Sequence, residues 1–479
     1  MSLKKEFLSG VFYTAVAKYS GIVISLIVSS ILARLLTPQE FGVVGVATVI
    51  IAFFNILGDI GIGPAVILHK ELTDRDLSSI HTFTTYTGLV LGAFFFLSAD
   101  IIADIYEDNK LVGICRLLSL SIVFTCWGIV PLNLSYKLKK FRKIAIVTLG
   151  VQLVSGFGAC IYAFYGGGVY ALVFQFVASS LLLSFVYNLS CGLKWSFKVT
   201  KESVNKIKSF SSYQFLFNIL SYFSRNSDKL LIGRYIGLSQ LGYYEKSYKL
   251  MMLPLQNITF VISPVLLPIF STIKDDVALL GEKYIKLLIP LAYLAFPISV
   301  ILYFCSPELI LIIFGSQWIS SIAPLQILSF TVGFQILSST TGGIFQALGE
   351  TKRMFHSGCW GAFFIVGSFI VSILGWRTIV AVCVGYLIAQ IANIIQCFYS
   401  LFKALDLSCL ILFRSLLKPM GISCLIFVIM WAQNLFLPIA PIWLSLLVKV
   451  LLGIFSTIII VQLTSPYNLY KIIKKGNIE

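Results

Sequence analysis

Charged residues are scarce in this chain of 479 residues. They make up 12% of it, whereas a soluble domain averages about 25%. Hydrophobic residues reach 58%, and the mean hydropathy is +0.94. Apolar stretches of roughly 20 residues recur from end to end, and each is long enough to cross a bilayer as a helix. This composition excludes a soluble globular protein and predicts an all-α, polytopic membrane protein.

Several patterns that carry chemistry are also missing. The ten cysteines contain no CxxC pair and the three histidines do not cluster. Small buried side chains are therefore favoured over a metal site or a disulfide framework. There is no GxSxG, HExxH or Walker motif, and the loops are too short for a catalytic domain. We expect neither enzymatic activity nor a cofactor.

Fourteen apolar segments are candidate spans. The first follows Lys4 and Lys5, but it lacks a small-residue cleavage site and is too long for a signal peptide, which predicts a retained span. An even number of spans places both termini on one side. The segments are about 11–33, 42–66, 82–103, 113–136, 144–165, 169–190, 211–235, 243–270, 284–304, 320–346, 355–376, 378–400, 412–433 and 441–463.

Lysine and arginine are divided unequally between the two sets of loops. One set holds the termini and the run KLKKFRK (137–143), whereas the opposite set has few bases and includes the acidic segment ADIIADIYED (99–108). The positive-inside rule predicts that both termini are cytoplasmic. This bias accounts for most of the net charge of +16. Nucleic-acid binding is disfavoured because no large soluble domain is present.

The two halves of the chain repeat weakly. ILARLLTPQEFG (31–42) aligns without a gap over LIGRYIGLSQLG (231–242), an offset of 200. After a small insertion the offset becomes 208, and Asp100 then lies over Glu308. Six spans separate the copies, so the repeats point the same way across the membrane, and transporters with such repeats bind substrate between the halves.

This repeat predicts a domain organisation around a central cavity. We expect a six-helix N-terminal lobe (1–200) and a six-helix C-terminal lobe (201–405). Two additional spans and a basic cytoplasmic tail (406–479) follow.

The seventh span contains FSRNSDKLLIGRY (223–235), which places four charges within a membrane segment. Its polar residues recur at steps of three and four, so they share one helical face. A polar face must meet protein or water rather than lipid. We therefore expect a hydrated cavity lined by Asn218, Tyr222, Arg225 and Lys229, with Lys18 on the matching face of the first span.

Alternative roles remain open for the charged residues. Asp228 lies one turn from Arg225, so the two can form a clamp that only fixes helix packing. Lys18 can instead extend to the membrane surface. Lys246 and Lys249 are either interfacial anchors or the upper part of the same cavity. Asp59 is a carboxylate within a span and pairs with a cation, exchanges a proton, or caps a helix break at the nearby glycines.

Five segments resemble the Wzx-type polysaccharide flippases, and the likeness is greatest to the colanic-acid-type exporters. This group belongs to the multidrug/oligosaccharidyl-lipid/polysaccharide exporter superfamily. The segments are LTPQEFGVVGVA (36–47), GDIGIGPAVI (58–67), YGGGVYALV (165–173), SRNSDKLLIGRYIGLSQLGYY (224–244) and IFQALGETKR (344–353).

The resemblance implies two six-helix lobes with two extra helices. It implies transport of an undecaprenyl-pyrophosphate-linked oligosaccharide across the bacterial cytoplasmic membrane by alternating access, coupled to H⁺ or Na⁺ and associated with polysaccharide-assembly proteins. Asp59, Arg225, Asp228 and Lys229 lie in the matching motifs. A lipid II flippase or a drug/cation antiporter of the same superfamily is the alternative. A membrane polysaccharide polymerase or ligase is a second one, although the outer loops are short.

Overall fold

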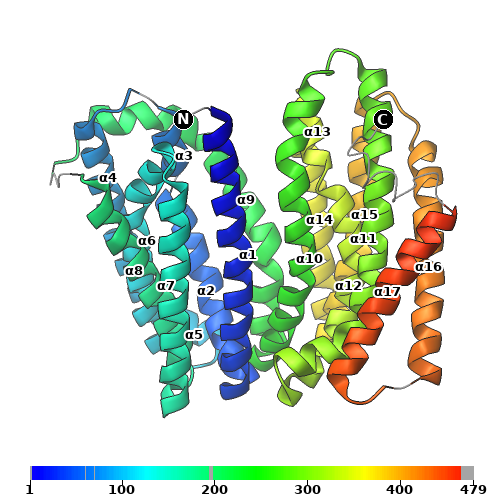
Figure 1. Cartoon of the computed structure of the whole chain (residues 1–479). Coiled ribbons are helices and arrows are strands. Elements are labelled where there is room, and N and C mark those ends of the chain that lie inside the picture. Colours follow the sequence, from blue (N-terminus) through cyan, green and yellow to red (C-terminus); the bar gives the residue numbers. More distant parts are fainter. Residues whose placement is uncertain (1–2, 60, 70, 194–197, 438, 465–479) are drawn as a thin grey trace. The chain divides into compact units, whose positions relative to one another are not determined.

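The computed structural model is helical, and the residues that it describes contain no strand, which confirms the all-α prediction (Figure 1). Contacts between residues divide the chain into two compact units, Met1–Gly242 and Tyr243–Glu479. The structure describes residues 3–464 except 60, 70, 194–197 and 438; side chains at 3–11, 204–218, 220–221, 263–264, 409 and 464 are not described.

Long helices lie side by side in the first unit, where α1 packs against α7, and α6 packs against both α4 and α8. A π-helical turn, Ala163–Gly167, joins α7 to α8. The helices are α1 (Leu3–Leu35), α2 (Pro38–Asp59), α3 (Ile62–Leu68), α4 (Asp74–Leu97), α5 (Ala99–Tyr106), α6 (Lys110–Lys137), α7 (Phe141–Tyr162), α8 (Tyr170–Cys191), α9 (Lys201–Tyr235) and the start of α10 (Leu238–Ser271).

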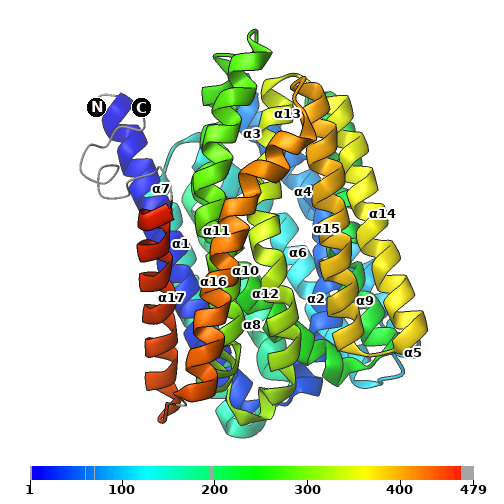
Figure 2. The ribbon, with the colours of Figure 1, turned by 90° about the vertical axis from the view of Figure 1, so that its right-hand side faces the viewer.

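The second unit is built on α11, which packs against α12, α16 and α17. Figure 2 shows α16 and α17 side by side on one flank of this unit. Its helices after α10 are α11 (Val277–Ile313), the 3₁₀ turn η2 (Ser316–Ser321), α12 (Ile322–Ser338), α13 (Thr341–Ala347), α14 (Thr351–Trp376), α15 (Ile379–Ala404), α16 (Cys409–Phe436) and α17 (Ile442–Thr464).

Thirteen helical segments of the described chain are long and apolar enough to cross a membrane, which makes this a multi-pass membrane protein. Helix α9, the predicted seventh span, is not among the thirteen. It has 35 residues, which is ample length, but its polar and charged side chains lower its hydropathy. The helix that departs from the membrane pattern is thus the one that carries the charge cluster.

The predicted lobe border at residues 200 and 201 falls inside the first unit, at the start of α9. Helix α9 packs against α2, α3, α4 and α5, so the contacts group it with the first unit, whereas the repeat assigns it to the second lobe. The division into two six-helix lobes with an additional helix pair, and the cavity between them, stay predictions.

Helix boundaries follow the predicted repeat. Helix α1 ends at Leu35 and α2 begins at Pro38, while α9 ends at Tyr235 and α10 begins at Leu238. Both pairs are related by the offset of 200 found in the sequence. The repeat is therefore visible in where the helices begin and end.

Local sequence explains why α2 begins at Pro38. The Thr37 hydroxyl accepts a hydrogen bond from the backbone N–H of Glu40 (3.3 Å), and the Glu40 carboxylate accepts one from the backbone N–H of Thr37 (2.7 Å). This reciprocal pair is a capping box, and proline at the first helical position costs no hydrogen bond. The TPQE motif therefore sets the start of the helix.

Small residues allow close helix packing in the first unit. A Cβ atom added to Gly58 of α2 would lie 2.4 Å from Cys126 Sγ of α6, and one added to Gly88 of α4 would lie 2.5 Å from Cys126 Cβ. In a membrane, where burial of apolar groups does not drive association, helices rely on such close approach. Cys126 is fully buried and serves as a small packing group.

Candidate functional site

The C-terminal half of α9 is held by groups from α2 and α5. The Tyr222 hydroxyl donates to the Val49 carbonyl, and the Tyr222 ring lies 6.0 Å from the Phe53 ring between centroids. The Tyr106 hydroxyl of α5 donates to the Leu230 carbonyl at 3.2 Å. Burial raises the pKa of Tyr106 to about 12, so this hydroxyl remains a donor at neutral pH. Tyr222 is thus a packing contact of the first unit.

The start of α9 is fastened to the start of α4. The Ser203 hydroxyl donates to Asp76 Oδ1 at 2.6 Å, and the Thr200 N–H donates to Ser79 Oγ at 2.8 Å. Asp76 also completes a capping box with Thr73. One carboxylate therefore serves two helix starts, which orients α9 where it enters the unit.

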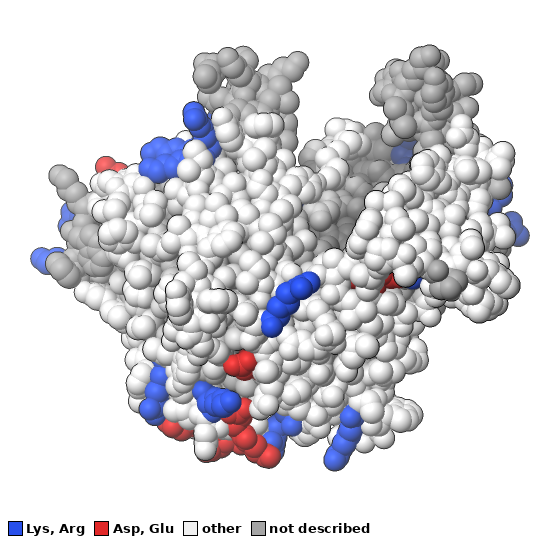
Figure 3. Space-filling view, turned by 60° about the horizontal axis from the view of Figure 1, so that its bottom comes forward, with Lys and Arg blue, Asp and Glu red and all other residues white. Residues whose placement is uncertain are grey.

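Ion pairs gather at the opposite end of the first unit, where α5 meets the ends of α6 and α9. Arg234 Nη1 lies 2.6 Å from Glu107 Oε1, and Arg116 Nη2 lies 3.0 Å from Asp100 Oδ2. The face that Figure 3 brings forward carries acidic side chains next to basic ones. This end holds the acidic segment 99–108.

Members of the α9 charge cluster lie in different surroundings. Arg225 is exposed and Lys229 is half-buried, whereas Asp228 is only 2% exposed. Asp228 Oδ1 accepts a hydrogen bond from the Lys229 N–H at 2.8 Å. Lys18 of α1 is half-buried. Asn218 lies outside the residues whose side chains are described, and a cavity role for the cluster stays a prediction.

Asp59 lies where α2 ends and α3 begins. Its Oδ1 accepts a hydrogen bond from the Gly63 N–H at 2.9 Å, in the first turn of α3. Gly61, between the two helices, has a φ of 76°, a left-handed conformation that glycine adopts without strain. The carboxylate therefore caps α3. This contact favours capping among the three roles considered for Asp59, and it leaves a proton role untested.

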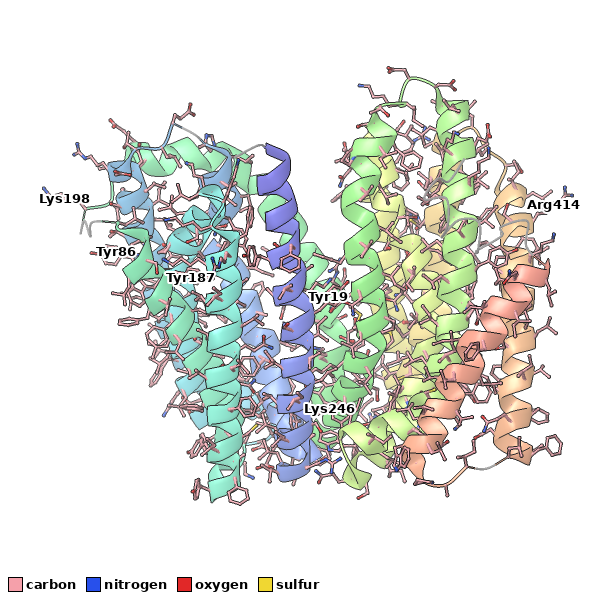
Figure 4. The ribbon with its side chains drawn as sticks, viewed as in Figure 1. Tyr19, Tyr86, Tyr187, Lys198, Lys246 and Arg414 are labelled. Carbon is pink, nitrogen blue, oxygen red and sulfur yellow. The ribbon has the colours of Figure 1, made fainter. Side chains whose placement is uncertain are left out.

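Lys246 and Lys249 belong to the second unit. Lys246, labelled in Figure 4, is 4% exposed, and its Nζ lies 5.0 Å from the Phe314 ring centroid and 5.1 Å from that of Trp318. Aromatic faces attract cations, more strongly when both are removed from water. Lys249 is half-buried. The predicted binding residues are thus divided between the two units.

Two repeat-related glycines meet at the crossing of α2 and the first residues of α10, within the first unit. A Cβ atom added to Gly42 would lie 1.8 Å from the Leu238 carbonyl oxygen, and one added to Gly242 would lie 2.0 Å from that of Pro38. Neither position has room for a methyl group. Each helix start therefore packs directly on the backbone of the other.

A buried ion pair in the second unit was not predicted from the sequence. Lys449 Nζ of α17 lies 2.5 Å from Glu308 Oε1 of α11, and the two side chains are 5% and 7% exposed. In the sequence, Glu308 stands out only in the alignment of the repeats, and no role was predicted for Lys449. The missed signal was a lone lysine inside an apolar span, which is costly and so indicates a partner.

Residues 31–323 match the family described as "Polysaccharide biosynthesis protein". The chain belongs to this family. It is 25% identical over 410 residues to the lipopolysaccharide biosynthesis protein WzxC of Escherichia coli (strain K12), covering 84% of this chain and 82% of that protein. It is also 25% identical to the succinoglycan biosynthesis transport protein ExoT of Rhizobium meliloti (strain 1021), covering 68% and 66%. The resemblance drawn from the motifs is confirmed.

Among solved structures, the chain is similar to the lipid II flippase MurJ in an inward closed conformation. The TM-score is 0.77 at 17% identity, and the match covers 95% of this chain and 98% of MurJ. At this identity the likeness establishes the fold alone.

Proposed function

We propose that this member of the polysaccharide biosynthesis protein family is a flippase. It moves an undecaprenyl-pyrophosphate-linked oligosaccharide from the inner to the outer leaflet of the bacterial cytoplasmic membrane. The family match over residues 31–323 carries this proposal. It is supported by a relative that is named a transport protein and by a membrane-spanning fold.

The substrate's pyrophosphate binds the basic residues of α9. Arg225 is exposed and Lys229 lies one helical turn away, and Lys18 of α1 adds a third positive charge. A guanidinium presents a planar fork of donors that matches phosphate oxygens, and an ammonium adds a point charge. Each such contact contributes roughly 1.5–3 kcal/mol. The other residues proposed to bind substrate are Asn218 and Tyr222 of the first unit and Lys246 and Lys249 of the second.

Transport proceeds by alternating access, coupled to a proton or sodium gradient. Asp59 and Asp228 are the acidic groups proposed for coupling or for holding charge in place. Both termini are cytoplasmic, as the lysine and arginine bias predicts. Polysaccharide-assembly proteins then receive the flipped substrate.

Reconstitution in vesicles tests this function. Vesicles carry a fluorescent polyprenyl-pyrophosphate oligosaccharide, and a membrane-impermeant reagent reports the fraction in the outer leaflet. We expect the protein to speed equilibration of this lipid and to leave lipid II and a cationic drug unmoved. Transport of the drug alone would assign the chain to the antiporters.

The basic site is tested in the same assay with two arginine variants on one helix. Arg225→Ala should slow flipping. Arg234→Ala, which removes an exposed ion pair with Glu107 at the end of α9, should not. Equal loss in both variants would indicate a general effect of charge on α9 and would count against a pyrophosphate site at Arg225.

A further inference from the structure

Glu308 has one satisfied carboxylate oxygen and one unsatisfied oxygen, although the residue is only 5% exposed. Its Oε1 accepts hydrogen bonds from Lys449 Nζ at 2.5 Å and from Ser445 Oγ at 2.7 Å. Its Oε2 is buried and has no hydrogen-bond partner in the described structure. Buried carboxylate oxygens are normally satisfied, so an orphan calls for an explanation such as a bound ion.

We propose that Glu308 is an exchangeable site for a monovalent cation, a proton or a sodium ion, which takes the place of the Lys449 ammonium. The proposal deepens the proposed ion coupling of the flippase, but the site exists or fails independently of the transported lipid. It lies wholly within the second unit, between α11 and α17.

The atoms around Lys449 Nζ suit such a cation. Besides Glu308 Oε1, the Phe304 carbonyl oxygen lies 3.2 Å from Nζ, and Ser445 Oγ is bonded to the same carboxylate. Carboxylate, carbonyl and hydroxyl oxygens are the ligands that hard cations prefer. An alkali ion at the ammonium position would lie near Glu308 Oε1 and the Phe304 carbonyl oxygen, with the Ser445 hydroxyl bonded to the same carboxylate.

Charge balance requires exchange rather than addition. One carboxylate balances one positive charge, so an external cation competes with the ammonium for Glu308. Sodium binding forms no covalent bond. Proton binding forms an O–H bond at Oε2, and Lys449 keeps its own proton and its charge. The titratable groups that interact with Glu308 in the described structure are Lys449 and, on α11 itself, Cys305.

A displaced ammonium has a short route to water. Lys449 is the eighth residue of α17, which begins at Ile442, so it lies about 10 Å along the helix from that end. A lysine side chain can extend along an apolar surface and place its charge at the interface. Glu308 is likewise near the end of α11, which stops at Ile313. Exchange therefore needs no passage of charge through the whole membrane.

Cation binding to the purified full-length chain tests the proposal without any lipid substrate. Radioactive sodium binding and proton uptake are measured on the wild type and on Glu308→Gln/Lys449→Met, which replaces the ion pair with neutral side chains of similar size. We expect the wild type to bind one sodium ion, or to take up one proton, and the double variant to lose that event. Asp100→Asn, at the repeat-related exposed carboxylate, should retain it.

Lys449→Met supplies a second readout, because it removes the competing ammonium. Its thermal midpoint should rise in sodium chloride relative to N-methyl-D-glucamine chloride, or fall with rising pH if the ligand is a proton. Its cation affinity should exceed that of the wild type by roughly tenfold or more. Unchanged sodium binding and proton uptake in the double variant would overturn the proposal. The Glu308–Lys449 ion pair of the wild type would then have a structural role only. If the wild type binds the cation but does not flip the lipid, that result would instead count against the proposed function.

Discussion

Asp100 and Glu308 occupy the same position in the two sequence repeats, yet their ion pairs lie in different surroundings. Asp100 pairs with Arg116 of α6, and the arginine and aspartate side chains are 43% and 61% exposed. Glu308 pairs with Lys449, and the lysine and glutamate side chains are 5% and 7% exposed. The second base comes from α17, which the predicted domain organisation places outside the repeat. Helix α17 thus buries an acidic position whose repeat-related counterpart is exposed.

Burial changes how much an ion pair contributes to the free energy of unfolding. Exposed ion pairs contribute about 0–1 kcal/mol because water and salt screen them. A buried pair gains little overall, but removal of one partner leaves a charge without compensation, at a cost of about 3–5 kcal/mol. The comparison therefore predicts unequal responses at equivalent positions.

Lys449→Met should give the largest effect. The variant leaves the Glu308 carboxylate buried and uncompensated, so the free energy of unfolding should fall by about 3–5 kcal/mol in sodium-free buffer. Denaturant unfolding of the detergent-solubilised protein measures it. The double variant Glu308→Gln/Lys449→Met should recover most of the loss, and a single variant as stable as the wild type would contradict the burial of the pair.

Alanine substitution should destabilise the protein equally at Gly42 and at Gly242, whereas substitutions at Asp100 and Glu308 should have unequal effects. Each has a backbone carbonyl within 2.0 Å of its would-be Cβ. Gly42→Ala or Gly242→Ala should therefore lower the free energy of unfolding by about 1–3 kcal/mol. Gly150→Ala is the matched control, since nothing lies within 4 Å of its would-be Cβ. Clearly different losses of stability at the two positions would contradict the equivalence of the two glycines at this helix crossing.

Asp59 distinguishes the broken helix of the first repeat from the continuous α10. Asp59→Ala should cost about 1 kcal/mol through loss of the α3 cap, and Asp59→Asn should cost little because asparagine also caps well. The repeat-related Thr259 lies inside unbroken α10, so Thr259→Ala removes no cap. Full export by Asp59→Asn at every external pH would exclude a proton role and leave the cap as the function of this carboxylate.

Substitutions in the exposed ion pair between Arg116 and Asp100 should have the smallest effect on stability. Arg116→Ala and Asp100→Asn should each change the free energy of unfolding by less than about 1 kcal/mol, and the difference should shrink as salt is added. A double-mutant cycle measures the coupling directly. Coupling as strong as that between Glu308 and Lys449 would mean that exposure does not separate the two pairs.

Much of the fold could be predicted from the sequence because membrane helices leave strong local signals. Apolar length predicted most of the helices: the first predicted span ends at 33 whereas α1 ends at Leu35, and the seventh ends at Tyr235 as predicted. The predicted span 42–66 was continuous, and a break at the glycines after Asp59 was one of three explanations for this carboxylate. Packing partners left weaker signals: nothing local indicates that Tyr222 donates to the Val49 carbonyl or that α9 groups with the first unit.

The candidate site was predicted less completely than the fold. The stripe on α9 follows from helical periodicity, which needs no knowledge of neighbours. The surroundings of Lys246 depend on Phe314 and Trp318, which lie about 70 residues away in the chain and contact it only after folding. The Glu308–Lys449 pair joins α11 to α17 over a longer separation. Such pairings are set by tertiary packing.

Binding of a pyrophosphate-linked lipid to the basic residues of α9 can be measured as substrate affinity in nanodiscs. Wild type, Arg225→Ala and Arg225→Ala/Asp228→Ala are compared for binding of the lipid-linked oligosaccharide. Both variants should bind about one to two orders of magnitude more weakly than the wild type, and the double variant should stay weak even if it expresses as well as the wild type. Wild-type affinity and full flipping by the double variant would contradict the claim and leave Arg225 as a packing residue.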